Sequence, residues 1–219
     1  MNIIAGADFH GSEAAFTEFA SEAEELGADV IIVCGDITHF GSAQEARDML
    51  SILSGLRIPL LFIPGNCDPK SLIGMDVEGA YCIHGEYRVY DDTIFYGVGG
   101  SPITPFNTPF EMSEDEIYSL LNKRSDVMDI HRWFILASHS PPKNTELDRI
   151  YSGAHVGSES LRRFIEERSP SLVLCGHVHE ARGIDRIGDT IIVNTGYAKD
   201  GEYVFISLDE EIEVYLRKM

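Results

Sequence analysis

The chain of 219 residues is acidic, with 17 Lys and Arg against 36 Asp and Glu and a formal net charge of −19. A surface of that charge repels polyanions, which argues against a nucleic-acid polymer as a partner. With 44% hydrophobic residues, the chain can bury one sizeable core. We therefore expect a single domain that spans residues 1–219.

The cysteines and the hydropathy pattern indicate a cytoplasmic protein. Cys34, Cys67, Cys82 and Cys175 are well separated and include no CxxC pair, which is typical of reduced thiols. The first residues contain no basic segment followed by an apolar one, and no apolar stretch approaches the ~20 residues that cross a bilayer. We expect no membrane partner. These patterns leave the oligomeric state open, including a homo-oligomer.

Short apolar runs and helical patterns follow one another along the chain. The apolar runs, which we predict to be buried strands, cover residues 3–7, 30–34, 60–63, 133–137, 172–175 and 190–193. The helical patterns cover residues 12–26, 42–53, 113–121 and 157–167. Ser12 is a candidate N-cap, and Ser113 with Glu116 has the spacing of a capping box.

Two segments, 80–97 and 201–216, alternate between apolar and polar residues, which is typical of antiparallel hairpins. Hairpins in addition to strand-helix units imply a second sheet. We predict an α/β fold in which two mixed sheets are flanked by helices, a four-layer α/β/β/α sandwich. Residues 101–110, with Pro102, Pro105 and Pro109, are predicted to be an irregular surface loop.

Polar residues of the kinds that bind metals follow five of the predicted strands. Because the carboxyl ends of parallel strands lie along one edge of a sheet, side chains that follow several strands can meet in one crevice. The candidates are Asp8 and His10 after the first strand, Asp36 after the second, Asn66 after the third, His139 after the fourth, and His177 and His179 after the fifth. The sequence therefore predicts one pocket that collects all of these donors.

The number and chemistry of the donors predict two metal ions. Seven donors exceed the usual four of a closed structural site, and they suit two ions that share a carboxylate. Carboxylate, imidazole and amide oxygen, without thiolate, favour divalent ions, of which we expect Mn²⁺ first and Fe²⁺, Zn²⁺ or Ni²⁺ as alternatives. Gly35, Gly65 and Gly176 each precede a candidate ligand, where glycine permits a sharp turn or a close approach.

The candidate ligands belong to ordered motifs, which are Asp8-Phe9-His10, Gly35-Asp36, Gly65-Asn66-Cys67-Asp68, Ser138-His139 and Gly176-His177-Val178-His179. In type and order they resemble the motifs of calcineurin-like metallophosphoesterases. The resemblance spans residues 8–179 and implies the α/β/β/α fold of that family. It also implies two metal sites that share Asp36 as a bridge. One would consist of Asp8, His10, Asp36 and His179, and the other of Asp36, Asn66, His139 and His177.

The resemblance further implies a metal-dependent phosphoesterase. A hydroxide held by the two metal ions would attack the phosphorus of a phosphate ester, because metal coordination lowers the pKa of water toward neutrality. We expect the substrate to be a small phosphodiester. The alternatives are a phosphomonoesterase or a nucleotide pyrophosphohydrolase with the same centre. An alternative of another class is a non-catalytic metal-binding scaffold of the same fold.

One position departs from the commoner family pattern, in which a histidine follows the asparagine and contacts the phosphate or helps the leaving group. That residue is Cys67 in this chain, and a thiol is not an equivalent cation. Asp68 matches the family's orienting carboxylate. The expected catalytic residues are therefore Asn66, Cys67 and Asp68, and the expected substrates are diesters or activated esters.

Three further residues are candidates for binding the substrate. His39 follows the Gly35-Asp36 turn, and Lys143 and His155 lie on the long loop after His139. Loops at strand ends often carry function, so we expect residues 141–156 to form a lid over the site. Selectivity for the substrate is expected to lie in this loop and in residues 101–110.

Overall fold

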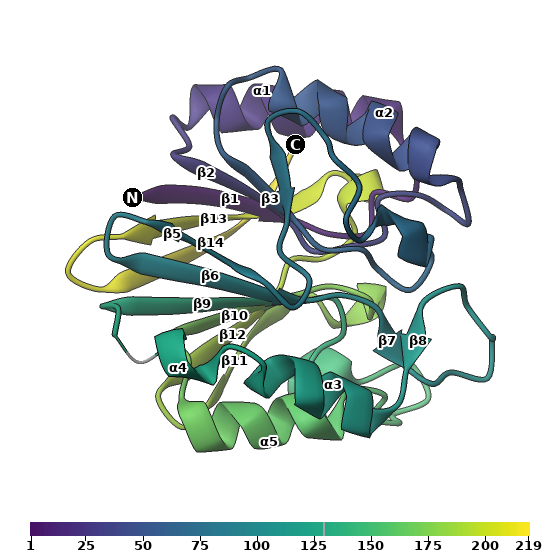
Figure 1. Ribbon diagram of the computed structural model, residues 1–219, viewed down its shortest axis with the longest axis vertical. Coiled ribbons are helices and arrows are strands. Elements are labelled where there is room, and N and C mark those ends of the chain that lie inside the picture. The colour runs from purple at the N-terminus through teal and green to yellow at the C-terminus, as the bar shows by residue number, and fades with distance from the viewer. Residues whose placement is uncertain (129) are drawn as a thin grey trace.

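Two mixed sheets pack face to face in the computed structural model (Figure 1), which describes residues 1–128 and 130–219. The first sheet has the order β14-β13-β1-β2-β3-β4, with β1 Asn2–Gly6, β2 Val30–Val33, β3 Leu60–Phe62, β4 Ala80–Cys82, β13 Glu202–Leu208 and β14 Ile212–Lys218. The second has the order β11-β12-β10-β9-β6-β5, with β5 Tyr87–Tyr90, β6 Thr93–Val98, β9 Trp133–Ser138, β10 Leu172–Cys175, β11 Gly183–Ile187 and β12 Thr190–Asn194. A short pair joins β7 Ser101–Pro102 to β8 Glu111–Met112.

Helices cover the outer face of each sheet (Figure 1). The helices are α1 Glu13–Glu25 and α2 Ala43–Ser54 on the first sheet, and α3 Glu114–Asn122, α4 Ser125–Met128 and α5 Glu159–Arg168 on the side of the second. The predicted four-layer α/β/β/α sandwich is confirmed. Within the described part of the chain, every helix is too short or too polar to span a membrane.

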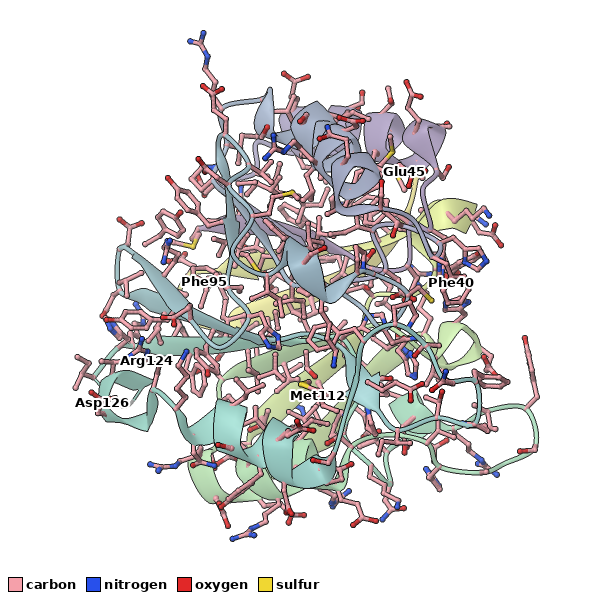
Figure 2. The ribbon with its side chains drawn as sticks, turned by 45° about the vertical axis from the view of Figure 1, so that its right-hand side comes forward. Phe40, Glu45, Phe95, Met112, Arg124 and Asp126 are labelled. Carbon is pink, nitrogen blue, oxygen red and sulfur yellow. The ribbon has the colours of Figure 1, made fainter. Side chains whose placement is uncertain are left out.

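Apolar side chains fill the spaces between the layers. Ile3 and Val30 of the first sheet belong to the same buried cluster as Ile135 and Phe95 of the second, and Phe95 lies between the sheets in Figure 2. Ile4, the neighbour of Ile3, instead packs in the cluster under α1 and α2, because successive strand residues point to opposite faces. Since both faces are buried, these strands are continuous apolar runs. Each fully buried Ile or Phe contributes roughly 1.5–3 kcal/mol to stability.

The helices begin close to the predicted residues, because side chains satisfy their first free N–H groups. Ser12 Oγ accepts a hydrogen bond from Ala15 N at 3.3 Å. Ser113 and Glu116 form the predicted capping box, in which Glu116 Oε2 accepts from Ser113 N at 2.8 Å. The last predicted helix begins two residues later than expected, at Glu159, because Ser158 is its N-cap.

Of the two alternating segments, one forms the predicted hairpin along its length, and the other does so only in its second part. The segment 80–97 divides between the sheets: β4 pairs parallel with β3 at the edge of the first sheet, and only β5 and β6 form an antiparallel hairpin in the second. The hairpin of β13 and β14 is antiparallel as predicted, but it joins β1 in the first sheet. Alternation reports which face of a strand is buried, and it does not identify the neighbouring strand.

The proline-rich segment 101–110 lies largely on the surface, as predicted. Its first two residues form β7. Ile103 and Phe106 then expose 74% and 82% of their surface. The loop is attached to the rest of the molecule at its end, where Phe110 N donates to the Asn66 carbonyl at 3.0 Å.

His84 supports the turn after β6 and makes stability depend on pH. Its Nδ1 accepts a hydrogen bond from Gly99 N at 2.9 Å. Burial, and next the charge of Lys123, lower the pKa of His84 to about 4, whereas the unfolded chain has a value of about 6.5. The stability contributed by neutral His84 is therefore present above about pH 6.5 and is lost as the pH falls toward 4.

We expect His84→Asn to reduce this pH dependence, because asparagine keeps an acceptor and does not titrate. Between pH 7 and pH 5, the wild-type free energy of unfolding should fall by on the order of 1 kcal/mol more than that of the variant. Urea unfolding at both pH values measures the difference, with His131→Asn as the control. Equal slopes for wild type and His84→Asn would contradict the assignment.

Candidate metal centre

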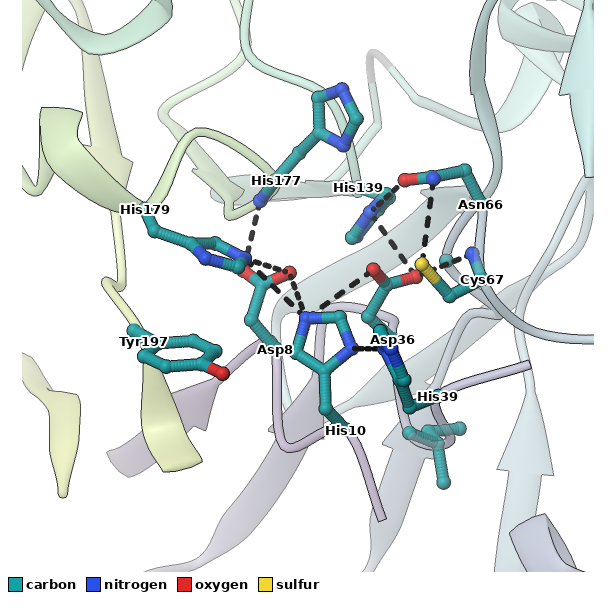
Figure 3. A network of polar contacts seen from close by, with 12 residues as sticks. Asp8, His10, Asp36, His39, Asn66, Cys67, His139, His177, His179 and Tyr197 are labelled. Atoms are coloured by element: carbon teal, nitrogen blue, oxygen red, sulfur yellow. Dashed lines mark hydrogen bonds and ion pairs between the residues drawn. The ribbon is translucent and has the colours of Figure 1, made fainter. Parts of the chain in front are cut away.

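Six of the seven predicted ligands meet at the carboxyl edges of both sheets, and His177 lies beside them (Figure 3). Asp8, Asp36 and Asn66 follow β1, β2 and β3 of the first sheet, and His139 and His177 follow β9 and β10 of the second. We call the seven predicted metal ligands the ligand cluster: Asp8, His10, Asp36, Asn66, His139, His177 and His179. Parallel neighbours within each sheet direct these residues to one edge, and the packing of the sheets brings the two edges together.

One part of the cluster consists of Asp8, His10 and His179. Asp8 Oδ1 lies 3.3 Å from His179 Nε2 and 3.9 Å from His10 Nε2, and the two Nε2 atoms are 3.4 Å apart. Asp8 Oδ2 accepts a hydrogen bond from His177 N at 2.8 Å. Asp8 Oδ1 is buried and accepts no hydrogen bond from any described residue. Such an oxygen is costly to bury, and a cation would satisfy it.

The other part consists of Asp36, Asn66 and His139. His139 Nδ1 lies 2.9 Å from the carbonyl of Cys34, which can only accept, so Nδ1 carries a proton and Nε2 is the nitrogen that faces the other ligands. This Nε2 faces Asn66 Oδ1 at 2.9 Å and Asp36 Oδ1 at 3.4 Å. Asn66 Nδ2 points instead to Cys67 Sγ. An imidazole nitrogen, an amide oxygen and a carboxylate oxygen therefore converge, and these are donor types that divalent cations bind.

The donor atoms have the spacing of metal ligands. Asp8, His10 and His179 have their ligand atoms within 4.8 Å of one another, as do Asp8, Asp36 and His139. His177 lies beside these groups: its ring centroid is 5.1 Å from that of His139, and its ring points away from the other ligands in Figure 3.

The protonation states suit a cation. Burial lowers the pKa of His10 to about 4 and that of His177 to about 3, so both imidazoles are neutral near pH 7 and offer a lone pair. Burial by itself would raise the pKa of Asp8, but the neighbouring histidines, His179 first, outweigh it and lower the pKa. Burial raises the pKa of Asp36 despite the presence of His139. A divalent ion would favour the ionised form of both carboxylates.

Backbone strain is concentrated at the same place. Ten non-glycine residues in the described ranges have positive φ, and four of them belong to the ligand cluster: Asp8 (61°), His10 (45°), Asp36 (50°) and His177 (69°). This conformation costs a residue with a Cβ energy, and it persists where the surrounding structure imposes it. The strand ends thus turn abruptly at residues of the ligand cluster.

Two of the predicted glycines allow parts of the cluster to approach each other closely. A Cβ at Gly65 would lie 2.0 Å from Asp36 Oδ1 and 2.2 Å from Asp36 N, and one at Gly176 would lie 2.5 Å from Asp8 Oδ2. These distances are far below van der Waals contact. Any larger residue at either position must displace a carboxylate of the cluster.

We expect Gly65→Ala to displace Asp36 and to lower Mn²⁺ affinity by at least ~10-fold, the usual scale for disturbing a ligand's support. Titration of the metal-stripped protein with Mn²⁺ measures the loss. Gly55→Ala is the matched control, because its Cβ would meet no atom closer than 3.5 Å and its φ is −60°. The prediction is wrong if both variants bind Mn²⁺ like the wild type.

Comparison with known proteins identifies the family. The model for calcineurin-like phosphoesterases matches residues 1–181. The chain belongs to this family. Members use divalent metal ions, and the clustered donors of this calcineurin-like phosphoesterase fit such ions.

Two relatives match this chain over most of its length. A protein of Methanocaldococcus jannaschii, described as uncharacterised, is 41% identical over 199 residues, which are 89% of this chain and 87% of the relative. A protein of Vesicomyosocius okutanii, described as a probable cyclic nucleotide phosphodiesterase, is 25% identical over 175 residues, or 78% of this chain and 71% of the relative.

Solved structures share the fold at low identity. A dimetal phosphatase from Danio rerio has a TM-score of 0.71 and 10% identity, with 100% of this chain and 96% of that chain covered. A Thermus thermophilus protein has a TM-score of 0.74 and 19% identity, with 98% of each chain covered.

In this calcineurin-like phosphoesterase, Asp68 and Cys67 hold the metal-ligand loops in place through hydrogen bonds. Asp68 is fully buried. Its Oδ1 accepts from Thr38 N and Thr38 Oγ1, both at 2.8 Å, and its Oδ2 accepts from Ile37 N at 3.0 Å and Gly65 N at 2.8 Å. It thereby joins the Asp36 loop to the Asn66 loop. Cys67 N donates to Asp36 Oδ1 at 2.8 Å, and burial raises the pKa of the Cys67 thiol, which stays neutral.

Of the three predicted substrate-binding residues, only His39 touches the ligand cluster. Its Nδ1 lies 3.3 Å from His10 Nδ1, and its side chain is exposed. Lys143 instead pairs with Glu159, and His155 Nδ1 lies 2.7 Å from the buried Asp148. These two residues line a cavity of about 390 Å³. Its described walls are formed by Pro102, Ile103, Met112, Ser113, Glu114, Lys143, His155, Val156, Gly157 and Glu159. None of these residues belongs to the ligand cluster.

Tyr197 was not among the predicted site residues, yet its ring stacks on that of His179 with centroids 4.2 Å apart and planes at 20°. A signal for it was present, because Tyr197 comes shortly after the strand predicted at residues 190–193. The rule that placed the ligands at strand ends applies to this strand as well.

Proposed function

We propose that this chain is a metal-dependent phosphodiesterase that acts on small phosphodiesters and uses two divalent ions, with Mn²⁺ preferred. The observation that carries the proposal is the convergence of metal-type donors around Asp36, where His139 Nε2 lies 2.9 Å from Asn66 Oδ1 and 3.4 Å from Asp36 Oδ1. We assign Asp8, His10, Asp36 and His179 to one ion and Asp36, Asn66, His139 and His177 to the other. Bound divalent ions supply neutralisation of phosphate charge and a lowered pKa of coordinated water.

The chain's own residues hold these donors in place. The Cys34 carbonyl fixes the tautomer of His139 by accepting from its Nδ1–H. Asp68 accepts four hydrogen bonds from the Asp36 and Asn66 loops. It therefore positions Asp36 and Asn66. The neutral Cys67 thiol is a poor proton donor for an alkoxide leaving group. This favours diesters with good leaving groups over substrates whose leaving group requires a proton.

A cavity beside the ligand cluster supports a diester over a nucleotide pyrophosphohydrolase. It has a volume of about 300 Å³ and is lined by His10, Gly11, Thr38, His39, Gly41, Glu45, Asp48 and Met49. Two carboxylates and no described Lys or Arg line it, so further phosphate groups would be repelled there. The relative described as a probable cyclic nucleotide phosphodiesterase also supports a diester. The complete donor set argues against a non-catalytic scaffold.

The proposal is tested by removing and restoring the metal. Stripped protein should hydrolyse bis(p-nitrophenyl) phosphate at least ~10³-fold more slowly than protein with Mn²⁺ restored, since the ions contribute several kcal/mol to the transition state. Fe²⁺, Ni²⁺, Zn²⁺ and Mg²⁺ are restored in parallel. p-Nitrophenyl phosphate is the matched monoester. Preferred turnover of the monoester would favour a phosphomonoesterase, and absence of turnover with two ions bound would favour the scaffold.

A further inference from the structure

Tyr197 comes from a part of the chain beyond residues 1–181, which the family model matches. It follows β12, and its ring lies flat on the imidazole of His179, as Figure 3 shows. The ring centroid of His10 is 5.7 Å from that of Tyr197. A residue outside the matched region therefore forms one wall of the ligand cluster.

The backbone around Tyr197 is attached to both sheets. Ala198 N donates to the Ala7 carbonyl at 3.0 Å, and Lys199 N donates to the Asp8 carbonyl at 3.3 Å. On the other side, Thr195 N donates to the Cys175 carbonyl at 2.8 Å, immediately before the His177 turn. Tyr197 N itself donates to Glu202 Oε2 at 2.9 Å. The position of the tyrosine ring is thus tied to the loops that carry Asp8 and His177.

His179 needs such a support more than the buried histidines do. Its side chain is 38% exposed, whereas that of His139 is fully buried. A metal-binding histidine usually donates its second ring N–H to an oxygen that orients the ring, as His139 does to the Cys34 carbonyl. Within the described residues, the Nδ1 atom of His179 has no hydrogen-bond partner. The stacked ring of Tyr197 covers one face of this imidazole and restricts its rotation.

We propose that Tyr197 is a positioning residue that holds the His179 imidazole in the orientation required to bind a divalent ion together with Asp8 and His10. The proposal rests on the metal assignment made above. The aromatic ring of Tyr197 provides this restraint, because the ring makes the face-to-face contact with the imidazole. The hydroxyl takes no part in that contact. Removing the ring should loosen one metal site and leave the Asn66–His139 site intact.

The test is calorimetric titration of the metal-stripped full-length chain with Mn²⁺. Tyr197→Ala should weaken one of the two ions by ~10- to 100-fold, the range for loss of an orienting partner, while Tyr197→Phe should bind like the wild type. Tyr197→Leu fills similar space without a planar ring, so its Mn²⁺ affinity should resemble that of Tyr197→Ala. It replaces Tyr197→Ala in the test if the alanine variant does not fold. Tyr215→Ala, at an exposed position on β14, is the control.

The outcomes separate this inference from the proposed function. Wild-type affinity in Tyr197→Ala or Tyr197→Leu would overturn the positioning role alone. Equal weakening in Tyr197→Phe would overturn it too, since the hydroxyl would then be responsible. A wild-type protein that binds no Mn²⁺ would sink the metal assignment and this inference together.

Discussion

Asp36→Asn should abolish hydrolysis, with a fall in kcat/KM of at least ~10³-fold and loss of at least one bound ion per chain, because metal catalysis contributes several kcal/mol. Asp36 is the carboxylate that lies between both parts of the cluster: Oδ1 is 3.4 Å from His139 Nε2, and Oδ2 is 3.7 Å from His10 Nε2. Asparagine has the same shape and can still accept the hydrogen bond from Cys67 N. The fold should therefore survive while the shared charge is lost.

Turnover of bis(p-nitrophenyl) phosphate and metal content by mass spectrometry measure this effect together. The matched control is Asp115→Asn, the same change at an exposed position on α3, which should keep wild-type activity. An Asp36→Asn protein with unchanged turnover would show that Asp36 does not bridge the ions.

Asp68→Ala should have the largest effect on stability, a loss of roughly 3–5 kcal/mol in the free energy of unfolding. Alanine leaves the buried donors Ile37 N, Thr38 N, Thr38 Oγ1 and Gly65 N without their acceptor. That loss is a large part of the 5–15 kcal/mol typical of a domain.

Urea unfolding of metal-stripped protein isolates this structural effect from metal binding. Asp29→Ala is the control, because Asp29 is exposed and accepts one hydrogen bond, from Asn2 N, so its loss should cost within about 1 kcal/mol. A loss below about 1 kcal/mol for Asp68→Ala would mean that solvent or rearranged loops replace the carboxylate.

Much of the local structure could be predicted from the sequence. The run at residues 172–175 coincides with β10, and Ser12 and Ser113 are the N-caps of α1 and α3. These features depend on a few neighbouring residues, through burial of both strand faces and satisfaction of the first N–H groups of a helix. The sheet to which β13 and β14 belong was not predictable in this way, because the pairing of β13 with β1 joins residues about 200 positions apart and alternation is the same in either sheet.

In the candidate site, too, some residues could be predicted from the sequence and others could not. The metal-type donors were identified from residue type and position after strands, and the structure brings Asp8, His10, Asp36, Asn66, His139 and His179 into contact. Lys143 and His155 were chosen only because they lie on the loop after His139. A loop that follows a ligand in the chain can turn away from it, and here these two side chains pair with Glu159 and Asp148.

The sequence by itself determined the strands that are continuous apolar runs, the starts of the four predicted helices, the donor types and the glycines that let the loops meet, since each follows from the chemistry of a residue and its near neighbours. Only the tertiary structure decided which edges face each other, the tautomer of His139, the partners of Asp68 and the stacking of Tyr197 on His179. These contacts join segments distant in the chain. They arise when the two sheets pack against each other, and no local pattern encodes that packing.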